Sequence, residues 1–526
     1  MSRDQSSSHL HAPLTDSEVE NRIGVVFRTL ARFSVVSVVD LAARALAAPK
    51  QSLLHDMQTM PWISLLLVEF AFRNKANHLL LGASMPGSTF DSLREELWQM
   101  IGSASLSGPS IQASLRSYLP AQVEFQVTRP SSAMRWPILV NRLPVNDDAR
   151  RMFVEVFQIT PEQYIDAVQV LLACTEKFGH VIPKAFVEHL PEQLSVPLRR
   201  IMDLISRNLL TLRREMQNIL MNGLPQRWEL IQIPFAAKFP LFEVESGDWF
   251  VWHPRMFKRA LEELPHKQLM SKGDQYLEIY TRHFESYVTE LTRAICPNLI
   301  EESQWKEKMG CNASAVEAIV PFDGVNVFVE AKMSYNHDAV LLVEDPGQLI
   351  SRLERVTDAV YQARKVSQRI RSESYKYPRR AEATEEFLIV VTSRDLYIGH
   401  GARLEELLPP GQLDFDDVGV NERMPLSNML VVSIDDFERL QAAVSNGRIS
   451  LLPFLRKMAV QNTDAATASL FLSDQLYKTI GPELDFTALI GEGRRASRER
   501  VVPVIEDTME RLQSGRNRSK TKRRRK

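Results

Sequence analysis

The sequence predicts an α/β protein in which a mostly helical N-terminal region precedes a mixed sheet flanked by helices. Two observations support this fold class. Apolar residues recur at three- and four-residue spacing through most of residues 16–220, a period typical of amphipathic helices. From residue 268 onward a helix, a strand–turn–strand unit, a second helix and two short strands follow in order, as expected for a helix-covered mixed sheet.

The size and composition are those of a globular protein with several domains. The chain has 526 residues, of which 44% are apolar and 25% charged, so it can bury sizeable cores. The net charge of −1 excludes a polycation, and any affinity for nucleic acid must come from local basic patches. Cys174, Cys296 and Cys311 lack CxxC spacing and are expected to be reduced thiols. No apolar run reaches the roughly 18 residues of a membrane span, so we expect a cytoplasmic protein without a membrane partner.

Changes in pattern along the chain predict five segments. Short strands are expected at 228–233, 241–244 and 249–252, the last two joined by a turn at Gly247-Asp248. The five segments are a mainly helical recognition or sensor region (1–225), a short β segment and connector (226–268), a mixed-sheet domain (269–455), a helical C-terminal extension (456–514) and a basic disordered tail (515–526).

A hairpin within residues 314–335 is defined by its turn. Asp323-Gly324 favours a two-residue type I′ turn, which requires positive φ at both positions. Centred there, the hairpin pairs Ala318 with Val329 and, one step further from the turn, brings Glu317 opposite Glu330. One face of the hairpin is then wholly apolar and is expected to be buried; it consists of Val316, Ala318, Val320, Phe322, Val325, Val327, Val329 and Ala331.

The opposite face of the hairpin carries charge. Glu317 and Glu330 face each other, and Lys332 follows two residues later on the same side. Like charges directly opposed across two strands are destabilising, so a positive group is expected between the two carboxylates. A divalent cation such as Mg²⁺ is one such group, because it takes one or two carboxylates together with water and phosphate oxygens.

Glu330-Ala331-Lys332, at the end of the apolar strand VNVFVEAK, resembles the E-x-K motif of the PD-(D/E)xK (restriction-endonuclease-like) nucleases. The resemblance covers residues of about 270–455. In that family the acidic partner on the preceding strand is usually Asp, and here the matching position is Glu317, a longer carboxylate. Asp323 would be the literal match in Pro-Phe-Asp, but seven strand residues at ~3.3 Å each separate it from Glu330, so it is assigned to the turn.

The resemblance implies roles for individual residues. Glu317, Glu330 and the backbone carbonyl of Ala331 would bind Mg²⁺ or Mn²⁺, and Lys332 would orient the attacking water. The family commonly has a Glu on the helix before the hairpin, a position matched by Glu285, and some branches have a Gln on the following helix, matched by Gln362.

The helix expected at 346–371 is rich in basic residues. We interpret Arg364, Lys365 and Arg369, together with Gln362, as nucleic-acid-binding residues, because lysine and arginine supply most sequence-independent affinity for phosphate backbones. The alternative is a solvated helix face without a ligand.

The resemblance implies a Mg²⁺-dependent endonuclease, with DNA favoured over RNA as substrate. By analogy with prokaryotic defence nucleases, the N-terminal region would be a sensor in an anti-phage effector. Two alternatives remain open: an enzyme that cleaves RNA such as tRNA, and a catalytically inactive scaffold that binds nucleic acid or protein. A protein trigger and a second copy of the chain are further candidate partners. The sequence has no P-loop, HExxH or GxSxG motif.

Overall fold

The computed structural model describes residues 14–48, 61–74, 82–104, 116, 119, 121–122, 125, 133–219, 227–333, 346–464, 467–481 and 487–523. The chain forms two compact units. The first comprises Met1–Gln126, Cys174–Ala185 and Met202–Ala260, and the second comprises Val127–Ala173, Phe186–Ile201 and Leu261–Lys526. The sequence analysis expects one boundary near residue 225, whereas each of these units is assembled from three separate stretches of chain.

The first unit combines a helical core with a small sheet. Helix α4 (Pro61–Arg73) is buried along its whole length and packs against α2 (Val35–Ala47), α5 (Gly87–Ala104) and α12 (Leu209–Ile219), with α1 (Asp16–Leu30) beside α5. The sheet has the order β1-β4-β3-β2, with strands β1 (Val181–Ile182), β2 (Ser206–Asn208), β3 (Leu241–Glu243) and β4 (Trp249–Val251).

Of the three short strands expected before residue 268, two are confirmed. β3 and β4 pair in antiparallel fashion around the expected turn, at which Gly247 has φ of 80°. The strand expected at 228–233 is wrong: residues Arg227–Leu230 form the 3-10 helix η2, and Leu230 and Ile231 are both buried, whereas a half-buried strand would alternate. A second 3-10 helix, η3 (Phe235–Ala237), follows it.

The remaining helices precede, cover or follow the sheet of the second unit. Those before it are α7 (Arg135–Asn141), α8 (Asp148–Phe157), α9 (Pro161–Phe178), α10 (Lys184–His189), α11 (Glu192–Ile205), α13 (Pro254–Leu269), η4 (Met270–Lys272) and α14 (Asp274–Ile295). Those within or after it are α15 (Glu302–Met309), α17 (Pro346–Ser372), α18 (Pro378–Ala381), α19 (Gly401–Glu406), α20 (Val418–Arg423), η5 (Leu426–Asn428), α21 (Ile434–Ser445), α22 (Leu451–Asn462), α23 (Leu472–Ile480) and α24 (Ala488–Arg523).

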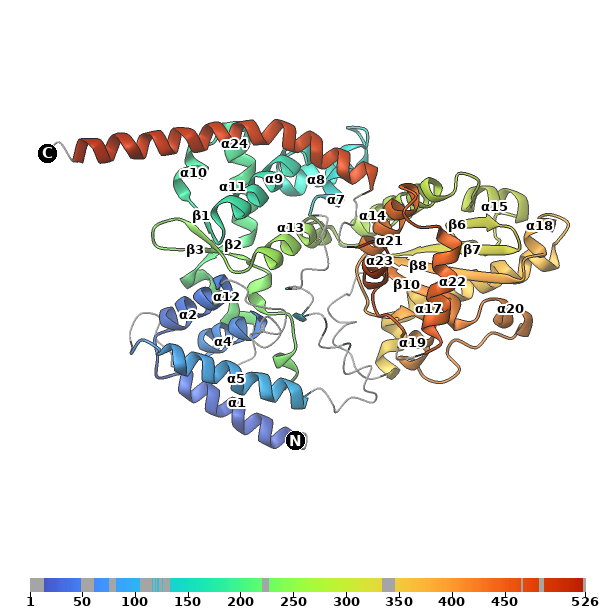
Figure 1. Cartoon of the computed structure of the whole chain (residues 1–526), viewed down its shortest axis with the longest axis horizontal. Coiled ribbons are helices and arrows are strands. Elements are labelled where there is room, and N and C mark those ends of the chain that lie inside the picture. The colour runs from blue at the N-terminus through green and yellow to red at the C-terminus, as the bar shows by residue number, and fades with distance from the viewer. Residues whose placement is uncertain are drawn as a thin grey trace, which may run out of the picture. The chain divides into compact units, whose positions relative to one another are not determined.

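A six-stranded mixed sheet forms the centre of the second unit, as the sequence predicts (Figure 1). Its order is β5-β6-β7-β8-β10-β9, with strands β5 (Ile300–Glu301), β6 (Ala318–Phe322), β7 (Val325–Lys332), β8 (Glu385–Thr392), β9 (Gly399–His400) and β10 (Met429–Ser433). The β5-β6-β7 and β10-β9 pairs are antiparallel, whereas β7-β8 and β8-β10 are parallel.

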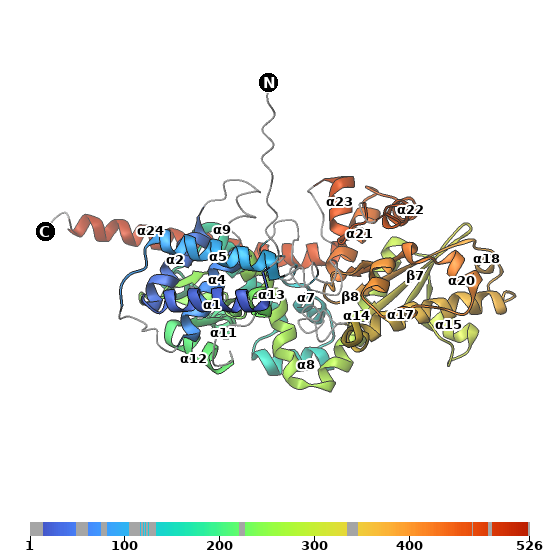
Figure 2. The same ribbon diagram turned by 90° about the horizontal axis from the view of Figure 1, so that it is seen from below.

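Helices cover both faces of this sheet. Figure 2 shows α21, α22 and α23 on one side and α17 on the other. The first face, together with α14, forms a hydrophobic core that includes most of the apolar face predicted for the hairpin. α17 covers the second face with a stripe of buried residues at three- and four-residue spacing, which are Leu349, Leu353, Val356, Val360, Ala363, Val366 and Ile370.

A buried polar cluster on the α17 side joins β7 to β8. Glu386 of β8 is fully buried and lies in register with Asn326 of β7. Its carboxylate accepts hydrogen bonds from Asn326 Nδ2 (3.1 Å), Arg371 Nη1 (3.0 Å) and the hydroxyl of Ser367. These bonds offset the high cost of burying a carboxylate. The cluster therefore ties α17 to two adjacent strands.

The C-terminal helix extends further along the chain than the sequence predicts. α22, α23 and α24 confirm a helical extension, but α24 continues to Arg523, so the prediction of a disordered tail from residue 515 is wrong as far as that residue. Residues 524–526 lie outside the described residues.

Two simpler expectations concern membranes and thiols. None of the described helices is both long and apolar enough to cross a membrane. All three cysteines are free thiols, with Cys174 buried, Cys296 half-buried and Cys311 exposed. This confirms that the cysteines form no disulfide.

Candidate active site

The hairpin has the register that its turn predicts. Ala318 pairs with Val329 and Phe322 with Val325, and Gly324 in the turn has φ of 66°. β6 begins one residue after Glu317, whose backbone N–H donates to Oε2 of Glu330 at 3.3 Å. The ladder and this bond bring Glu317 beside Glu330 at the end of the hairpin opposite the turn.

Glu330 is a buried carboxylate with one direct cationic partner. Only 3% of its surface is exposed, because α17 covers this face of β7. Oε1 forms an ion pair with Nζ of Lys332, which lies two residues further along the same strand. The strand thus presents an acid and a base side by side, as the E-x-K motif requires.

Both carboxylates bind protons more tightly than ordinary glutamates. Burial raises the pKa of Glu330 to about 7, although the charge of Lys332 opposes this shift. Burial, followed by the charges of Glu330 and Glu285, raises the pKa of Glu317 to about 9. Both shifts arise first from burial, which disfavours the charged carboxylate; for Glu317 the neighbouring carboxylates add to it.

Gln362 of α17 completes the surroundings of Lys332. The ammonium group donates to Oε1 of Gln362 at 2.8 Å, so Lys332 is held between a carboxylate and an amide. The buried stripe of α17 fixes this helix on the sheet and directs Gln362 toward the end of β7. The structure therefore places Gln362 in the candidate site. The sequence analysis expects Gln362 to contact nucleic acid, whereas the contact seen here is with Lys332.

Glu285 of α14 approaches the same place from the other side of β7. It lines one pocket with Ala331 and Lys332 and a second pocket with Glu317. Its pKa is raised by burial, and the charge of Lys332 acts against that shift. The position on the preceding helix, expected from the family pattern, is thus close to the hairpin carboxylates.

The first of these pockets lies at the end of β7. It has a volume of about 400 Å³ and combines backbone at the end of β7 with polar side chains of α14 and α17. Its lining residues that carry positive charge are Lys332, Arg355 and Lys365. Tyr361 also lines it, and its hydroxyl is held by the carbonyl groups of Gln412 and Asp414.

Arg364 and Arg369, which the sequence analysis interprets as nucleic-acid-binding, both make contacts within the protein. Arg364 is buried, whereas the side chain of Arg369 is 36% exposed. Arg364 is only 3% exposed and donates to the carbonyl of Leu413, so it cannot contact a phosphate. Arg369 forms an ion pair with Glu373 and donates to the carbonyl of Met309 at 2.8 Å. Lys365, which is exposed, lines the pocket, and so does Arg355, which the sequence analysis did not select.

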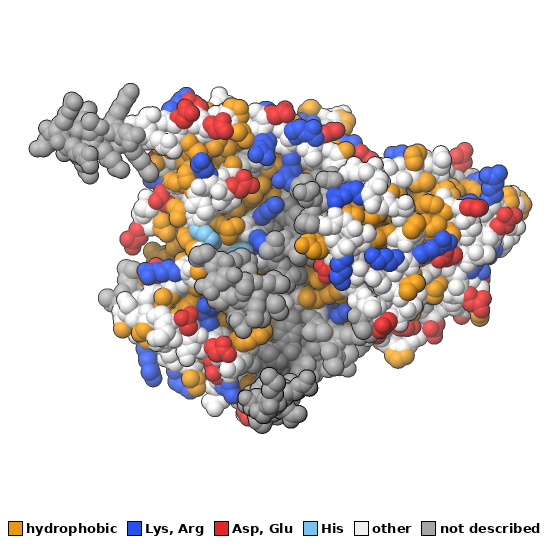
Figure 3. Space-filling model, viewed as in Figure 1, with side chains coloured by type: hydrophobic (Ala, Val, Ile, Leu, Met, Phe, Trp, Pro, Cys, Tyr) orange, Lys and Arg blue, Asp and Glu red, His pale blue; other side chains and the backbone are white. Residues whose placement is uncertain are grey.

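Charge is mixed over the visible surface. On the face shown in Figure 3, basic and acidic side chains of the described residues are interspersed with apolar ones. This distribution agrees with the net charge of −1. Attraction of an anionic ligand would therefore depend on local groups such as those of the pocket.

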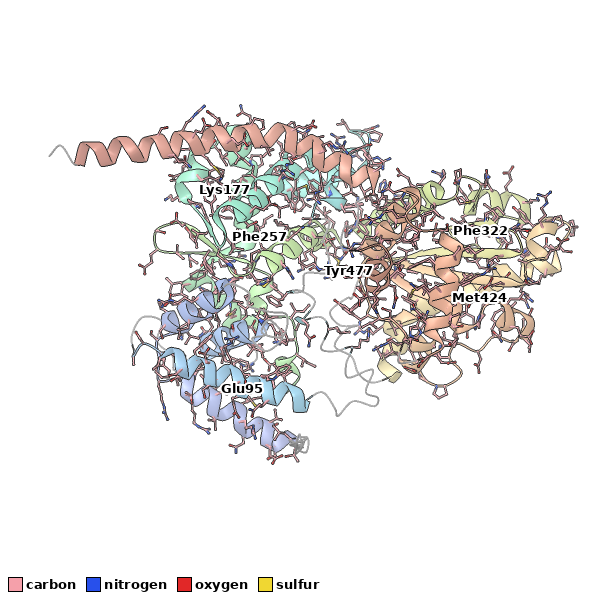
Figure 4. All side chains as sticks on the ribbon, in the orientation of Figure 1. Glu95, Lys177, Phe257, Phe322, Met424 and Tyr477 are labelled. Carbon is pink, nitrogen blue, oxygen red and sulfur yellow. The ribbon has the colours of Figure 1, made fainter. Side chains whose placement is uncertain are left out.

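Asp323 is a turn residue, as the hairpin register predicts. It follows Phe322, labelled in Figure 4, and precedes the first residue of β7. Glu330 is the sixth residue of β7, which starts at Val325, so Asp323 and Glu330 lie toward opposite ends of the strand. The literal Pro-Phe-Asp match is thus excluded from the site.

The sequence analysis missed Glu302. The backbone N–H of Glu302 donates to the carbonyl of Glu317 at 3.2 Å, and both residues line the second pocket, of about 700 Å³. Edge strand β5, which precedes Glu302, has only two residues. Two residues are too few to show the alternation by which a strand is recognised in a sequence.

The donor set suits Mg²⁺ better than a metal bound entirely by protein. Within the described ranges, no three His, Cys, Asp or Glu side chains lie close enough together to hold a metal ion. Mg²⁺ commonly takes only one or two carboxylates, with water and phosphate oxygens as its other ligands. Glu317 and Glu330, whose pKa values are raised by burial and, for Glu317, by the charge of Glu330, fit such a site.

No protein-family model, no curated protein and no solved structure matches this chain. The functional argument therefore depends on the geometry of the site.

Proposed function

We propose that the second unit is a Mg²⁺-dependent nuclease of the PD-(D/E)xK type, which hydrolyses phosphodiester bonds of nucleic acid. The observation that carries the proposal is the convergence of Glu317, Glu330, Lys332 and Gln362 at the end of β7, beside a polar pocket whose lining includes Lys332, Arg355 and Lys365 as well as Glu285 and Asp358. The mixed sheet, with α14 before the hairpin and α17 after it, supports the proposed family.

In this proposal the carboxylates and the lysine have separate tasks. Glu317, Glu330 and the carbonyl of Ala331 hold the cation, which when bound polarises the scissile phosphate and acidifies a water molecule. Lys332, fixed by Gln362, orients the attacking water and stabilises negative charge that develops on the phosphate. Glu285 anchors this arrangement from α14.

The first experiment is a cleavage assay with the full-length protein. Plasmid DNA, single-stranded DNA and total RNA are incubated with it in Mg²⁺, in Mn²⁺ and in EDTA. We expect cleavage of DNA with either metal and none in EDTA. Cleavage of RNA alone would assign the enzyme to the RNA-cleaving class. No cleavage of any substrate with either metal would contradict the nuclease proposal.

An inactive scaffold is the second candidate, and one observation favours it. Lys332 already neutralises Glu330, and the high pKa of Glu317 leaves that group mostly protonated at neutral pH, so the site is nearly satisfied without a metal. Binding of nucleic acid that is insensitive to Mg²⁺, without cleavage, would identify this scaffold.

The role of the first unit follows from the same proposal. The first unit has its own helical core and sheet, and in this proposal its surface recognises the trigger. The protein would then be a cytoplasmic anti-phage effector, by analogy with defence nucleases that join a sensor to a nuclease. Cleavage that depends on a phage component or on a second protein would support this role.

The turn residue provides a specific test of the register. In the turn Gly324 has positive φ but Asp323 does not, so the turn is not the expected type I′. Asp323→Asn should leave Mg²⁺-dependent cleavage within about twofold of the original rate, because Asn has nearly the shape of Asp and is also favoured in turns. Initial rates on the substrate that the first assay identifies give the measurement. A large loss of activity in Asp323→Asn, with Glu317→Gln unaffected, would place the acidic partner at the turn instead.

The pocket predicts which cation binds substrate. Lys365→Glu should weaken nucleic-acid binding for all sequences alike and reduce the slope of log affinity against log salt by about 0.9 or more on duplex DNA. Titrations in EDTA at several salt concentrations measure this effect without cleavage. Arg352→Glu is the control: it is exposed on the same helix but is not among the described residues lining the pocket. If Lys365→Glu and Arg352→Glu weakened nucleic-acid binding equally, α17 would attract nucleic acid only through its overall positive charge, without a specific contact from Lys365.

A further inference from the structure

Glu302, the first residue of α15 directly after β5, extends the pair of carboxylates into a row of three. In the β5-β6 ladder Ile300 pairs with Ile319 and Glu301 with Ala318, so the next step brings Glu302 opposite Glu317. The hydrogen bond from the Glu302 amide to the Glu317 carbonyl continues that ladder. Glu317 in turn lies beside Glu330, whose carboxylate accepts from its amide. We call Glu302, Glu317 and Glu330 the acidic row.

Each end of the acidic row has its own lysine. Lys332 pairs with Glu330 and is fixed by Gln362. At the other end Lys306, one turn into α15, pairs with Glu302 in an i,i+4 arrangement. The pKa of Lys306 is raised first by its hydrogen bond to Glu302, and the charges of Glu317 and Glu285 add to this. The ammonium group thus lies in the field of three carboxylates.

The two lysines differ in how firmly they are held. The side chain of Lys332 is 18% exposed, whereas that of Lys306 is 40% exposed and that of its partner Glu302 43%. An exposed lysine on a flexible stem can move into water at little cost, because a solvent-exposed i,i+4 ion pair contributes little to stability. Lys306 can therefore leave the acidic row without disturbing the fold.

We propose that Lys306 is an exchangeable counter-ion of the acidic row, which pairs with Glu302 beside Glu317 while no divalent cation is bound and withdraws when one binds. This inference rests on the proposed metal site. Lys306 acts through the carboxylates and is a positioning residue. Its presence sets the Mg²⁺ concentration at which the site fills, because a nearby positive charge competes with the cation for the same carboxylates.

The test compares metal binding by variants of two lysines on α15. Lys306→Met removes the charge and keeps an unbranched side chain of good helix propensity. Lys308→Met is the matched control, because Lys308 lies over the ring of Tyr377, 4.1 Å from its centre. Lys306→Arg keeps the charge. Binding of Mn²⁺ to the full-length protein is measured by electron paramagnetic resonance, with Glu317→Gln defining the signal from the acidic row.

Lys306→Met should bind Mn²⁺ about twofold more tightly than the wild type, because withdrawing an exposed lysine from its ion pair costs little. Lys306→Arg and Lys308→Met should bind like the wild type. In EDTA, Lys306→Met should have nearly the Tm of the wild type, because the exposed pair contributes little to stability, and it should gain more Tm on addition of Mn²⁺ than the wild type.

The outcomes separate this inference from the nuclease proposal. Equal Mn²⁺ affinity of the wild type and Lys306→Met would overturn the counter-ion role and leave the nuclease proposal intact. Tighter binding in Lys306→Met, with no cleavage by any form, would support the counter-ion role and contradict the nuclease. If neither form binds Mn²⁺ at a site lost in Glu317→Gln, both proposals fail.

Discussion

Glu330→Gln and Lys332→Met should each reduce Mg²⁺-dependent cleavage by about a hundredfold or more. Glu330→Gln removes a negative ligand of the cation, which contributes several kcal/mol through polarisation of the phosphate, and each 1.36 kcal/mol corresponds to tenfold in rate. Lys332→Met removes the group that stabilises developing charge, an effect of roughly 10²–10³ at comparable positions. Single-turnover rates at saturating substrate and Mg²⁺ measure both.

The stability of the same variants shows whether the loss is chemical. Lys332→Met leaves the buried carboxylate of Glu330 without its cationic partner, so this variant should be the less stable of the two. The double variant should recover most of that stability, because the uncompensated charge is gone, but should remain inactive. Urea unfolding followed by circular dichroism gives the comparison. Wild-type cleavage by a folded Glu330→Gln protein would remove Glu330 from the proposed centre.

Arg135→Met should destabilise the second unit by about 3–5 kcal/mol, the usual cost of breaking a buried ion pair from one side. Arg135 of α7 is 9% exposed and binds Glu438 through Nε (2.6 Å), Glu262 through Nη1 (2.9 Å) and Asp435. Glu438 also accepts from the hydroxyl of Tyr287, so α7, α13, α14 and α21 meet at this guanidinium. Its loss would leave three carboxylates without their shared cation.

Thermal unfolding measures this effect, and the expected fall in Tm is on the order of 10 °C. Arg142→Met is the matched control, because Arg142 makes a bidentate pair with Glu290 but its side chain is 44% exposed. An exposed pair contributes about 0–1 kcal/mol, so this variant should unfold close to the wild type. Similar shifts in both variants would mean that the Arg135 cluster contributes little beyond an ordinary surface pair.

The hairpin could be predicted from sequence because its information is local. Asp323-Gly324 specifies the turn, the turn fixes the register, and the period of two then assigns each residue to a face. Gln362 and Glu285 could be selected only through the resemblance to a family, since their proximity to Lys332 depends on how α17 and α14 pack on the sheet.

Other features depend on contacts between distant parts of the chain. The basic run of α17 has the composition of an exposed face, but residues 413–415 cover Arg364, and burial lowers the pKa of its guanidinium. The pairing of Glu302 with Glu317 needs a two-residue edge strand that has no pattern of its own. The chain passes from one unit to the other several times, so no single change in composition along the sequence marks their boundary.

The buried cluster around Glu386 has a consequence for the accuracy of the site. If β7 slipped by one residue against β8, Asn326 would turn to the other face, and Glu386 would lose its amide partner while remaining buried. The same slip would turn Glu330 and Lys332 away from Gln362. The Asn326–Glu386 contact therefore fixes the register of β7 against β8. In this way it keeps Glu330 and Lys332 on the face that carries Gln362, from the opposite end of the strand.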